Sequence, residues 1–322
     1  MRKFVHILVI SIMAALIVCP IAAYALTVDP FYAGAYTATS LGSVPGVPTN
    51  YGGLTLKAGD PNTLLIGGSA NNAAGKLYAI GVTRDVNNHI IGFSGTASFY
   101  ADAAYNDGGV QYGPGGVLFL TRWPVNEIGQ TKPGSASTDK IVALSPLGVA
   151  DSVGGLAFVP AGVPGAGQLK LVSWSGGEWY TATYAADGLG TYDITSAAYE
   201  LTIGGGPEGI AYVPIGSPLF ANPSLLISEF SAGKVATYEI DANGNPVLAT
   251  RRDFITDLTG AEGAFIDPLT GDFLFSTFGG GNQVVVVQGF VAPPPVPTPA
   301  TFLLFGSGLA ALIGLNRRLG QP

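Results

Sequence analysis

Short stretches in which hydrophobic and polar residues alternate recur throughout residues 26–291, and each is followed by a glycine- or proline-rich turn. Such two-residue alternation is typical of β-strands with one buried face. Five stretches open with a glycine, at spacings of 56, 46, 54 and 54 residues: Gly53, Gly109, Gly155, Gly209 and Gly263. After each glycine the pattern predicts an alternating strand, a more apolar second strand, a third strand and a weaker fourth one. No part of this region has a convincing helical period of 3.6 residues.

A repeat of four antiparallel strands in about 50 residues predicts the blade of a β-propeller. We therefore expect an all-β fold with five four-stranded blades, in which the repeated glycines lie near the crowded axis. A sixth blade within residues 84–108 is one alternative, and two flat sheets packed as a β-sandwich are another. The fifth unit ends after its third strand. We expect residues 31–39 to supply its fourth strand by pairing with residues 283–287, which would close the ring.

The first 25 residues have the order of a secretory signal. A positive start at Arg2 and Lys3 precedes an apolar run over residues 4–23, and Ala23 and Ala25 flank one large residue as signal peptidase requires. We predict a signal helix that is cleaved after Ala25, and an uncleaved membrane anchor is the alternative. The only cysteine, Cys19, would leave with the signal, so the exported protein would have no disulfide.

A proline-rich linker over residues 292–299 separates the repeats from a final segment, residues 300–322. Proline lacks a backbone donor and stiffens the chain, so this linker can neither pair in a sheet nor form a helix. Residues 300–315 carry no charge and predict a hydrophobic helix, slightly shorter than the ~20 residues that span a bilayer. Arg317 and Arg318 follow, and they would hold its end on the cytoplasmic side.

The residues around the linker resemble the PEP-CTERM sorting signal, which consists of a proline-flanked motif, a glycine-containing apolar run and a basic end. The matching residues are Val296, Pro297, Thr298, Pro299, Ala300, Arg317 and Arg318. Thr298 stands where that signal has a glutamate. The resemblance implies a protein exported by a Gram-negative bacterium, anchored transiently at the inner membrane and processed by an exosortase-like enzyme. An ordinary C-terminal membrane anchor is the alternative.

The net charge of the region between the two ends limits the classes of partner that it can bind. The two ends contain four of the 14 basic residues and none of the 21 acidic ones, so the region between them carries a net charge of −11. A strongly acidic body argues against binding of nucleic acid and against charge-driven adhesion to anionic membranes.

Glutamates directly precede two of the repeated glycines, in Pro207-Glu208-Gly209 and Ala261-Glu262-Gly263. These openings resemble those of NHL, gluconolactonase and strictosidine-synthase-like propellers, and the resemblance implies that a carboxylate there can hold a divalent metal at the channel mouth. Glu229, which follows a second strand, is the candidate third ligand. Solvated or hydrogen-bonded carboxylates are the alternative to a calcium or other divalent metal site. The other three units have glycine at the matching position: Gly52, Gly108 and Gly154.

Other candidate chemistry is sparse. His89 is the only histidine in residues 26–291, so a Ser–His pair is not expected. Residues 241–245 alternate oxygen-bearing side chains as in a calcium loop, but Asn243-Gly244 between two strands favours a solvent-facing hairpin turn. Four aromatic residues near second strands either line a carbohydrate-binding face or pack between blades: Trp123, Trp174, Trp179 and Phe278.

These features predict an exported cell-surface or extracellular-matrix protein whose β-propeller binds a partner or a glycan. A metal-dependent, lactonase-like enzyme that uses Glu208 and Glu262 is the alternative. We expect no cofactor apart from the metal that this alternative would need. The expected partners are signal peptidase, an exosortase-like enzyme, the membrane through the tail, and a glycan or matrix component.

Overall fold

The computed structural model of the protein describes residues 26–294. The predicted signal helix with Ala23 and Ala25, and the predicted sorting tail over residues 296–318, lie outside these residues and stay predictions. The described region is all-β, and its helices are single 3₁₀ turns: η1 (Pro114–Gly116), η2 (Ser145–Leu147) and η3 (Leu248–Thr250). Among the described residues, no helix is both long enough and apolar enough to cross a membrane.

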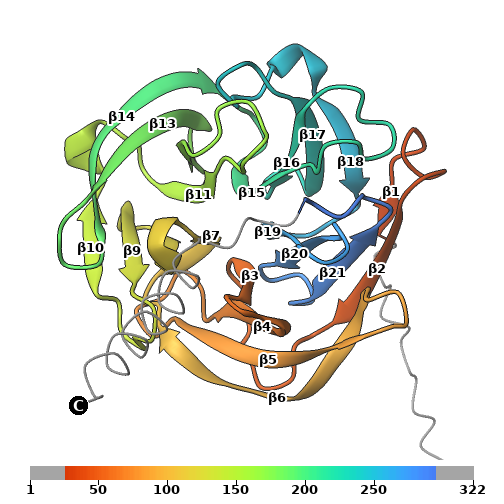
Figure 1. Ribbon diagram of the computed structural model, residues 1–322, viewed down its shortest axis with the longest axis horizontal. Helices are drawn as coiled ribbons and strands as arrows, with labels where there is room; N and C mark the ends of the chain where they lie inside the picture. Colours follow the sequence, from red (N-terminus) through yellow and green to blue (C-terminus); the bar gives the residue numbers. More distant parts are fainter. Residues whose placement is uncertain (1–25, 295–322) are drawn as a thin grey trace, which may run out of the picture.

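Five antiparallel sheets are arranged radially around one axis, so the fold is a five-bladed β-propeller (Figure 1). From axis to rim, blade 1 consists of β3 (Leu54–Lys57), β4 (Asp60–Gly68), β5 (Lys76–Arg84) and β6 (Ile90–Asp102). Blade 2 consists of β7 (Asn106–Tyr112), β8 (Leu118–Arg122), β9 (Glu127–Thr131) and β10 (Lys140–Ala143). Blade 3 consists of β11 (Val153–Phe158), β12 (Leu169–Ser173), β13 (Glu178–Ala186) and β14 (Tyr192–Thr202).

Blades 4 and 5 receive strands from the start of the chain. Blade 4 consists of β15 (Pro207–Tyr212), β16 (Ser224–Glu229), β17 (Lys234–Glu239) and β18 (Arg252–Thr256), and β1 (Thr27–Val28) is added at its rim. Blade 5 consists of β19 (Ala261–Ile266), β20 (Phe273–Thr277), β21 (Val284–Gln288) and β2 (Thr37–Gly42).

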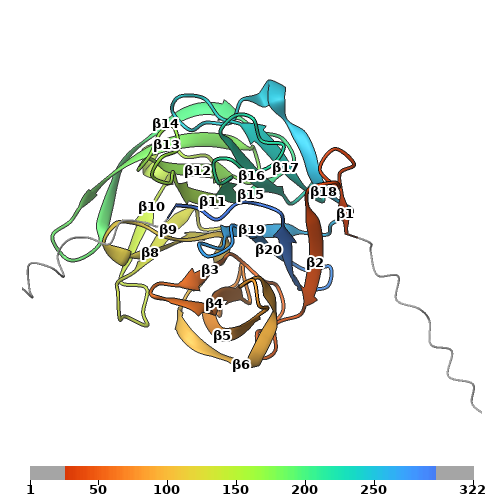
Figure 2. The same ribbon diagram turned by 45° about the vertical axis from the view of Figure 1, so that its right-hand side comes forward.

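The predicted count of five blades is confirmed, and both alternatives are wrong. Residues 84–108 contain no sixth blade, because they form the outer strand β6 of blade 1 and the start of β7. The sheets radiate from a common axis rather than stacking as two layers, which an oblique view also shows (Figure 2).

Strand β2 closes the ring by pairing with β21, in a register that runs from Thr37↔Gln288 to Ser40↔Val285. The predicted closure is confirmed, but the boundaries of the closing strand are wrong, because it spans 37–42 rather than 31–39. Residues 30–35 form turns. Here Tyr32 and Tyr36 both pack on Phe254 of blade 4, with ring centroids 5.0 and 5.4 Å apart. Burial of two aromatic rings therefore overrides the local strand pattern.

The innermost strands touch one another through the repeated glycines. A Cβ on Gly209 would lie 2.5 Å from the backbone nitrogen of Ala264 in the next blade. Between blades 2 and 3, Thr121 Oγ1 accepts a hydrogen bond from Gly109 N–H (2.9 Å) and donates one to the Gly154 carbonyl (2.8 Å). The predicted axial position of these glycines is confirmed, and the axis is packed with backbone.

The hydrophobic core lies between neighbouring blades. One cluster joins Phe119 and Ile128 of blade 2 to Leu156 and Leu171 of blade 3. Because both sides of each blade are covered in this way, the loops at the two ends of the propeller are the parts that remain free to bind other molecules.

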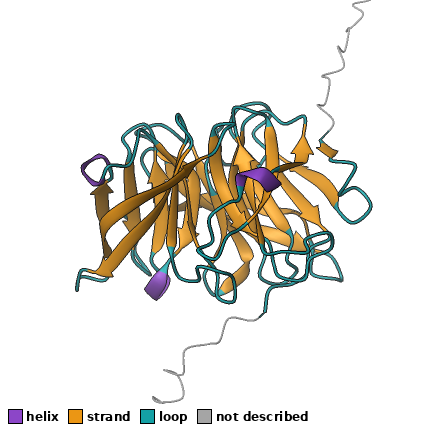
Figure 3. Cartoon of the chain, turned by 90° about the horizontal axis from the view of Figure 1, so that it is seen from above, coloured by secondary structure: helices purple, strands orange, loops and turns teal. Residues whose placement is uncertain are grey.

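We define the two faces of the propeller by the innermost strands. These strands begin on the first face, where the second strand of each blade ends, and they end on the second face. A view from the side shows the loops gathered at the two ends of the propeller (Figure 3). On the first face, Thr27 of β1 pairs with Thr256 at the end of β18. Pro293 and Pro294, the last described residues, lie on the second face beside the ends of β15 and β19. The described chain therefore starts and finishes on opposite faces.

Candidate functional site

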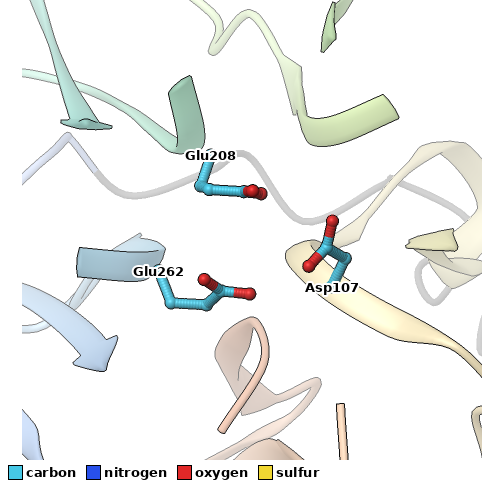
Figure 4. A group of neighbouring side chains, drawn as sticks. All are labelled: Asp107, Glu208 and Glu262. Atoms are coloured by element: carbon cyan, nitrogen blue, oxygen red, sulfur yellow. The ribbon is translucent and has the colours of Figure 1, made fainter. Parts of the chain in front are cut away.

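Three carboxylates converge near the axis on the first face. Asp107 lies in β7, Glu208 in β15 and Glu262 in β19, which belong to blades 2, 4 and 5. One oxygen from each carboxylate lies within 4.8 Å of those of the other two. The side chains point toward one another (Figure 4). The structure thus brings the two predicted glutamates together, and we call these three residues the acidic trio.

The acidic trio is enclosed by protein. The exposed fraction is 1% for Asp107, 3% for Glu208 and 1% for Glu262. Three of the oxygens, Asp107 Oδ2, Glu208 Oε2 and Glu262 Oε1, have no hydrogen-bond partner outside the trio, and Asp107 is within hydrogen-bonding reach of both glutamates. The amide of Asn71 supplies a neutral donor 2.9 Å from Asp107 Oδ1. Within residues 26–294, no basic side chain forms an ion pair with the trio.

Burial changes the protonation of all three carboxylates. It raises the pKa of Asp107 to about 7. Burial, reinforced by repulsion from the neighbouring carboxylates, also raises the pKa of Glu208 and of Glu262 well above the usual range. Three carboxylates this close in a dry site cannot all be ionised without a neutralising partner. The trio therefore holds protons or binds a cation, and carboxylate oxygens are ligands that calcium and magnesium prefer.

Glu229, the predicted third ligand, does not belong to this cluster, and that prediction is wrong. Its Oε1 accepts hydrogen bonds from Tyr238 Oη (2.6 Å) and Arg251 Nε (2.9 Å), and its Oε2 pairs with Arg251 Nη2 at 2.5 Å. This pair between a buried carboxylate and an exposed guanidinium is structural, because it ties the second strand of blade 4 to the segment before β18. The third carboxylate of the cluster comes from Asp107 instead.

Asp107 was missed because it does not directly precede its repeated glycine. It lies two residues before Gly109, whereas the two glutamates lie one residue before theirs. The pairing of β7 with β8 is irregular between Asn106 and Val110, which shifts the register there. The sequence does show that Asp107 directly precedes Gly108, which could have indicated a site. It does not reveal the irregular strand pairing that turns the Asp107 side chain toward the axis.

A row of aromatic rings borders the same face, and we call it the aromatic arc. The rings come from Trp123, Trp174, Phe230 and Phe278, each of which directly follows the second strand of its blade and is partly exposed. Neighbouring ring centroids are 6.2, 6.2 and 6.0 Å apart, in edge-to-face geometry. Three of the four predicted aromatic residues therefore lie on the first face, and sequence reasoning missed Phe230.

Trp179 packs between blades 3 and 4 instead. It is fully buried, and its Nε1 donates to Asn245 Oδ1 at 3.2 Å. The same oxygen accepts a hydrogen bond from Lys170 Nζ at 2.7 Å. Lys170 is fully buried, and this burial lowers its pKa to about 8. These contacts join the two blades and leave Trp179 no role on a binding surface.

The segment 241–245 is a hairpin turn, as predicted. Asp241 Oδ1 accepts hydrogen bonds from the N–H groups of Asn243 (2.9 Å) and Asn245 (2.8 Å). Gly244 is buried, however, so the prediction that this turn faces solvent is wrong. A Cβ on Gly244 would lie 2.8 Å from the carbonyl oxygen of Pro164 in blade 3.

The second face carries an apolar cavity of about 400 Å³. Its lining includes Ile210, Tyr212, Phe265 and Pro294. His89 also lies toward this face, at the end of the β5–β6 hairpin, where its Nδ1 is 2.8 Å from Asp272 Oδ2 of blade 5. The single described histidine is therefore on the face opposite the acidic trio.

The fold and the site define a five-bladed β-propeller whose first face combines a buried acidic trio with an aromatic arc. No protein-family model and no curated protein matches the chain. Solved structures with a similar fold include the PQQ domain of pyranose dehydrogenase from Coprinopsis cinerea, at 10% identity and a TM-score of 0.48, with 83% of this chain and 97% of that chain covered. An auxiliary nutrient binding protein from Bacteroides thetaiotaomicron has 11% identity and a TM-score of 0.44, with coverages of 78% and 76%. Likenesses at this level carry no argument about function.

Proposed function

We propose that the protein is an exported, glycan-binding propeller that holds a neutral polysaccharide on its first face. The observation that carries this proposal is the aromatic arc. Four of the five blades place a partly exposed ring at the same position, directly after the second strand. Repetition of partly exposed rings on one face is unexpected for residues whose only role is packing, because fully buried positions would serve packing better.

The chemistry of the arc suits a sugar. The C–H faces of pyranose rings stack on aromatic side chains, while their hydroxyl groups need hydrogen-bond partners beside the stack. The net charge of −11 for the region between the two ends disfavours an anionic polysaccharide. A neutral glycan is therefore the ligand class that we propose.

Binding of neutral oligosaccharides tests this proposal, with calorimetry and intrinsic tryptophan fluorescence as readouts. We expect Trp174→Ala to weaken binding by about tenfold, because one stacking platform is lost. Tyr199→Ala is the matched control, since Tyr199 is an exposed aromatic residue on the outer strand β14, away from the arc. Equal effects of the two substitutions, or no binding across a panel of neutral glycans, would refute the proposal.

Export and sorting complete the proposed role. The signal over residues 1–25 and the PEP-CTERM-like tail support release of the propeller outside the cytoplasm, with exosortase-like processing near Pro299. Intact-mass spectrometry of native extracellular protein should show a chain that starts at Leu26 and lacks most of residues 300–322. A full-length C-terminus would instead support the plain membrane anchor.

A divalent cation in the acidic trio is the second candidate, and it would be required for the lactonase-like alternative. Its support is that each of the three carboxylates has a buried oxygen without a hydrogen-bond partner outside the trio, and that one oxygen of each lies within 4.8 Å of those of the other two. At pH 8, calcium or magnesium chloride should raise the melting temperature of the wild type, because a ligand that binds only the folded state stabilises it. Glu262→Gln should abolish this shift, whereas Glu178→Gln, outside the trio, should retain it. No shift in the wild type would exclude the cation, and lactone hydrolysis that survives Glu208→Gln would exclude the enzyme.

A further inference from the structure

The exposed hydrophobic residues of the described chain are concentrated on the second face. Fourteen large hydrophobic residues are exposed in the described chain, and nine of them lie in turns and loops of this face. Four others are on outer strands, and only Val125, 38% exposed, is in a loop of the first face. The nine are Phe31, Val86, Leu189, Ile215, Leu219, Val247, Leu248, Leu269 and Val291. We call them the apolar loops.

Most of the apolar loops are neighbours in blades 4 and 5. Phe31 and Leu219 border one shared hollow, whose polar lining includes Glu239, Arg251 and Arg252. Ile215 lines the apolar cavity. Ser217, in the same loop as Ile215, accepts a hydrogen bond at its Oγ from Val291 N–H, at 3.3 Å. These contacts hold the exposed side chains in one surface around the cavity.

Val86 joins this surface from blade 1 and is the most exposed of the set, at 97%. Its hairpin is fixed to blade 5 by the buried ion pair between Arg84 Nη1 and Asp267 Oδ2, at 2.6 Å. Asp267 begins the turn that presents Leu269. These two contacts connect the hairpin that carries Val86 to the turn that carries Leu269.

The chain leaves the propeller at this same face. Pro293 and Pro294 line the cavity. Five residues, 295–299, separate Pro294 from the uncharged run over residues 300–315. Even fully extended, a linker of this length spans at most about 20 Å. If residues 300–315 enter a bilayer before the proposed cleavage near Pro299, as their sequence predicts, the second face must lie close to the surface of that bilayer until the tail is removed.

We infer that the second face docks on a lipid surface, with the apolar loops inserted among the acyl chains near the headgroups. Such insertion is driven by burial of apolar area. A negatively charged body is consistent with apolar insertion and not with electrostatic attraction to anionic lipids. The first face, with the aromatic arc and the acidic trio, would then point away from the membrane toward solvent, where a large ligand can reach it.

The test uses residues 26–322, which contain no cysteine, with one introduced cysteine, Leu269→Cys or Val125→Cys, labelled with an environment-sensitive fluorophore. Both positions are exposed apolar residues in loops, on opposite faces. In phosphatidylcholine vesicles with brominated acyl chains, we expect strong quenching of the label at position 269 and little at position 125. The same vesicles without bromine should leave both labels bright.

Three outcomes would overturn the inference. The first is no quenching at position 269, and the second is equal quenching at the two positions. The third is a label at position 269 that is not quenched by brominated lipid and that becomes more shielded from water as the protein concentration rises. That result would mean that a second copy of the chain covers this face. The glycan-binding experiment is independent of all three, since it probes the first face.

Discussion

A methyl group added at Gly209 should destabilise the propeller, because this glycine lies where two innermost strands touch. In Gly209→Ala the new Cβ would lie 2.5 Å from the backbone nitrogen of Ala264 and 2.5 Å from the carbonyl carbon of Gly263. Ordinary van der Waals contact begins near 3.4 Å, so blades 4 and 5 would have to separate by about 1 Å. The obstructing atoms are backbone, which cannot rotate out of the way as a side chain can.

Overpacking of this kind costs about 1–3 kcal/mol, and because the contacts are with backbone we expect Gly209→Ala to lie at the upper end of that range. For a domain of this size the expected fall in melting temperature is about 6–12 °C. Gly204→Ala is the matched control, because Gly204 is exposed, has no positive φ and has no atom within 4 Å of an added Cβ. It should leave stability unchanged or raise it by about 0.5 kcal/mol, by reducing the freedom of the unfolded chain.

Thermal and urea unfolding of the two variants and the wild type would measure the difference. The urea slope should stay the same, since the surface exposed on unfolding does not change. Equal, small effects of the two substitutions would mean that the innermost strands do not meet at the axis, and the explanation for the glycine repeat would then be wrong.

Three further predictions concern charge and ring closure. In the absence of divalent cations, the free energy of unfolding should fall as pH rises from about 4 through 7. The reason is that the raised pKa of each carboxylate in the acidic trio makes the folded state bind more protons than the unfolded state. Melting temperatures at pH 5 and pH 8 should show this fall, and Glu262→Gln should make it smaller. Burial lowers the pKa of Lys170 from 10.5 to about 8, so between pH 8 and pH 10.5 the unfolded state binds more protons than the folded state. The free energy of unfolding should therefore rise by about 2–3 kcal/mol across that pH window, and urea titrations of Lys170→Met should show no such rise. Deletion of residues 26–44 removes β2 and leaves β21 as an open edge, so light scattering should detect aggregation; a truncated protein that stays monomeric and melts unchanged would contradict the closure.

The blade architecture was predictable because its signals are local. Each repeated glycine, each alternating strand and each turn is a property of consecutive residues, and five similar units indicate a propeller before any contact is known. The closing role of the N-terminal segment followed from counting strands. Its boundaries did not, because Tyr32 and Tyr36 are drawn into the core beside Phe254, a residue more than 200 positions away.

The sequence by itself determined the five-fold repeat, the glycines at the axis, and the glutamates that open two of the innermost strands. Only the tertiary structure decided which side chains share a site. It placed Asp107 with Glu208 and Glu262, and it paired Glu229 with Arg251 instead. It also placed Trp123 and Trp174 on the first face and buried Trp179 between blades. The physical reason is that convergence depends on how separate blades meet around the axis and on register irregularities within them. A one-residue change in register turns a side chain to the opposite face of its sheet, and nothing in the local pattern records it.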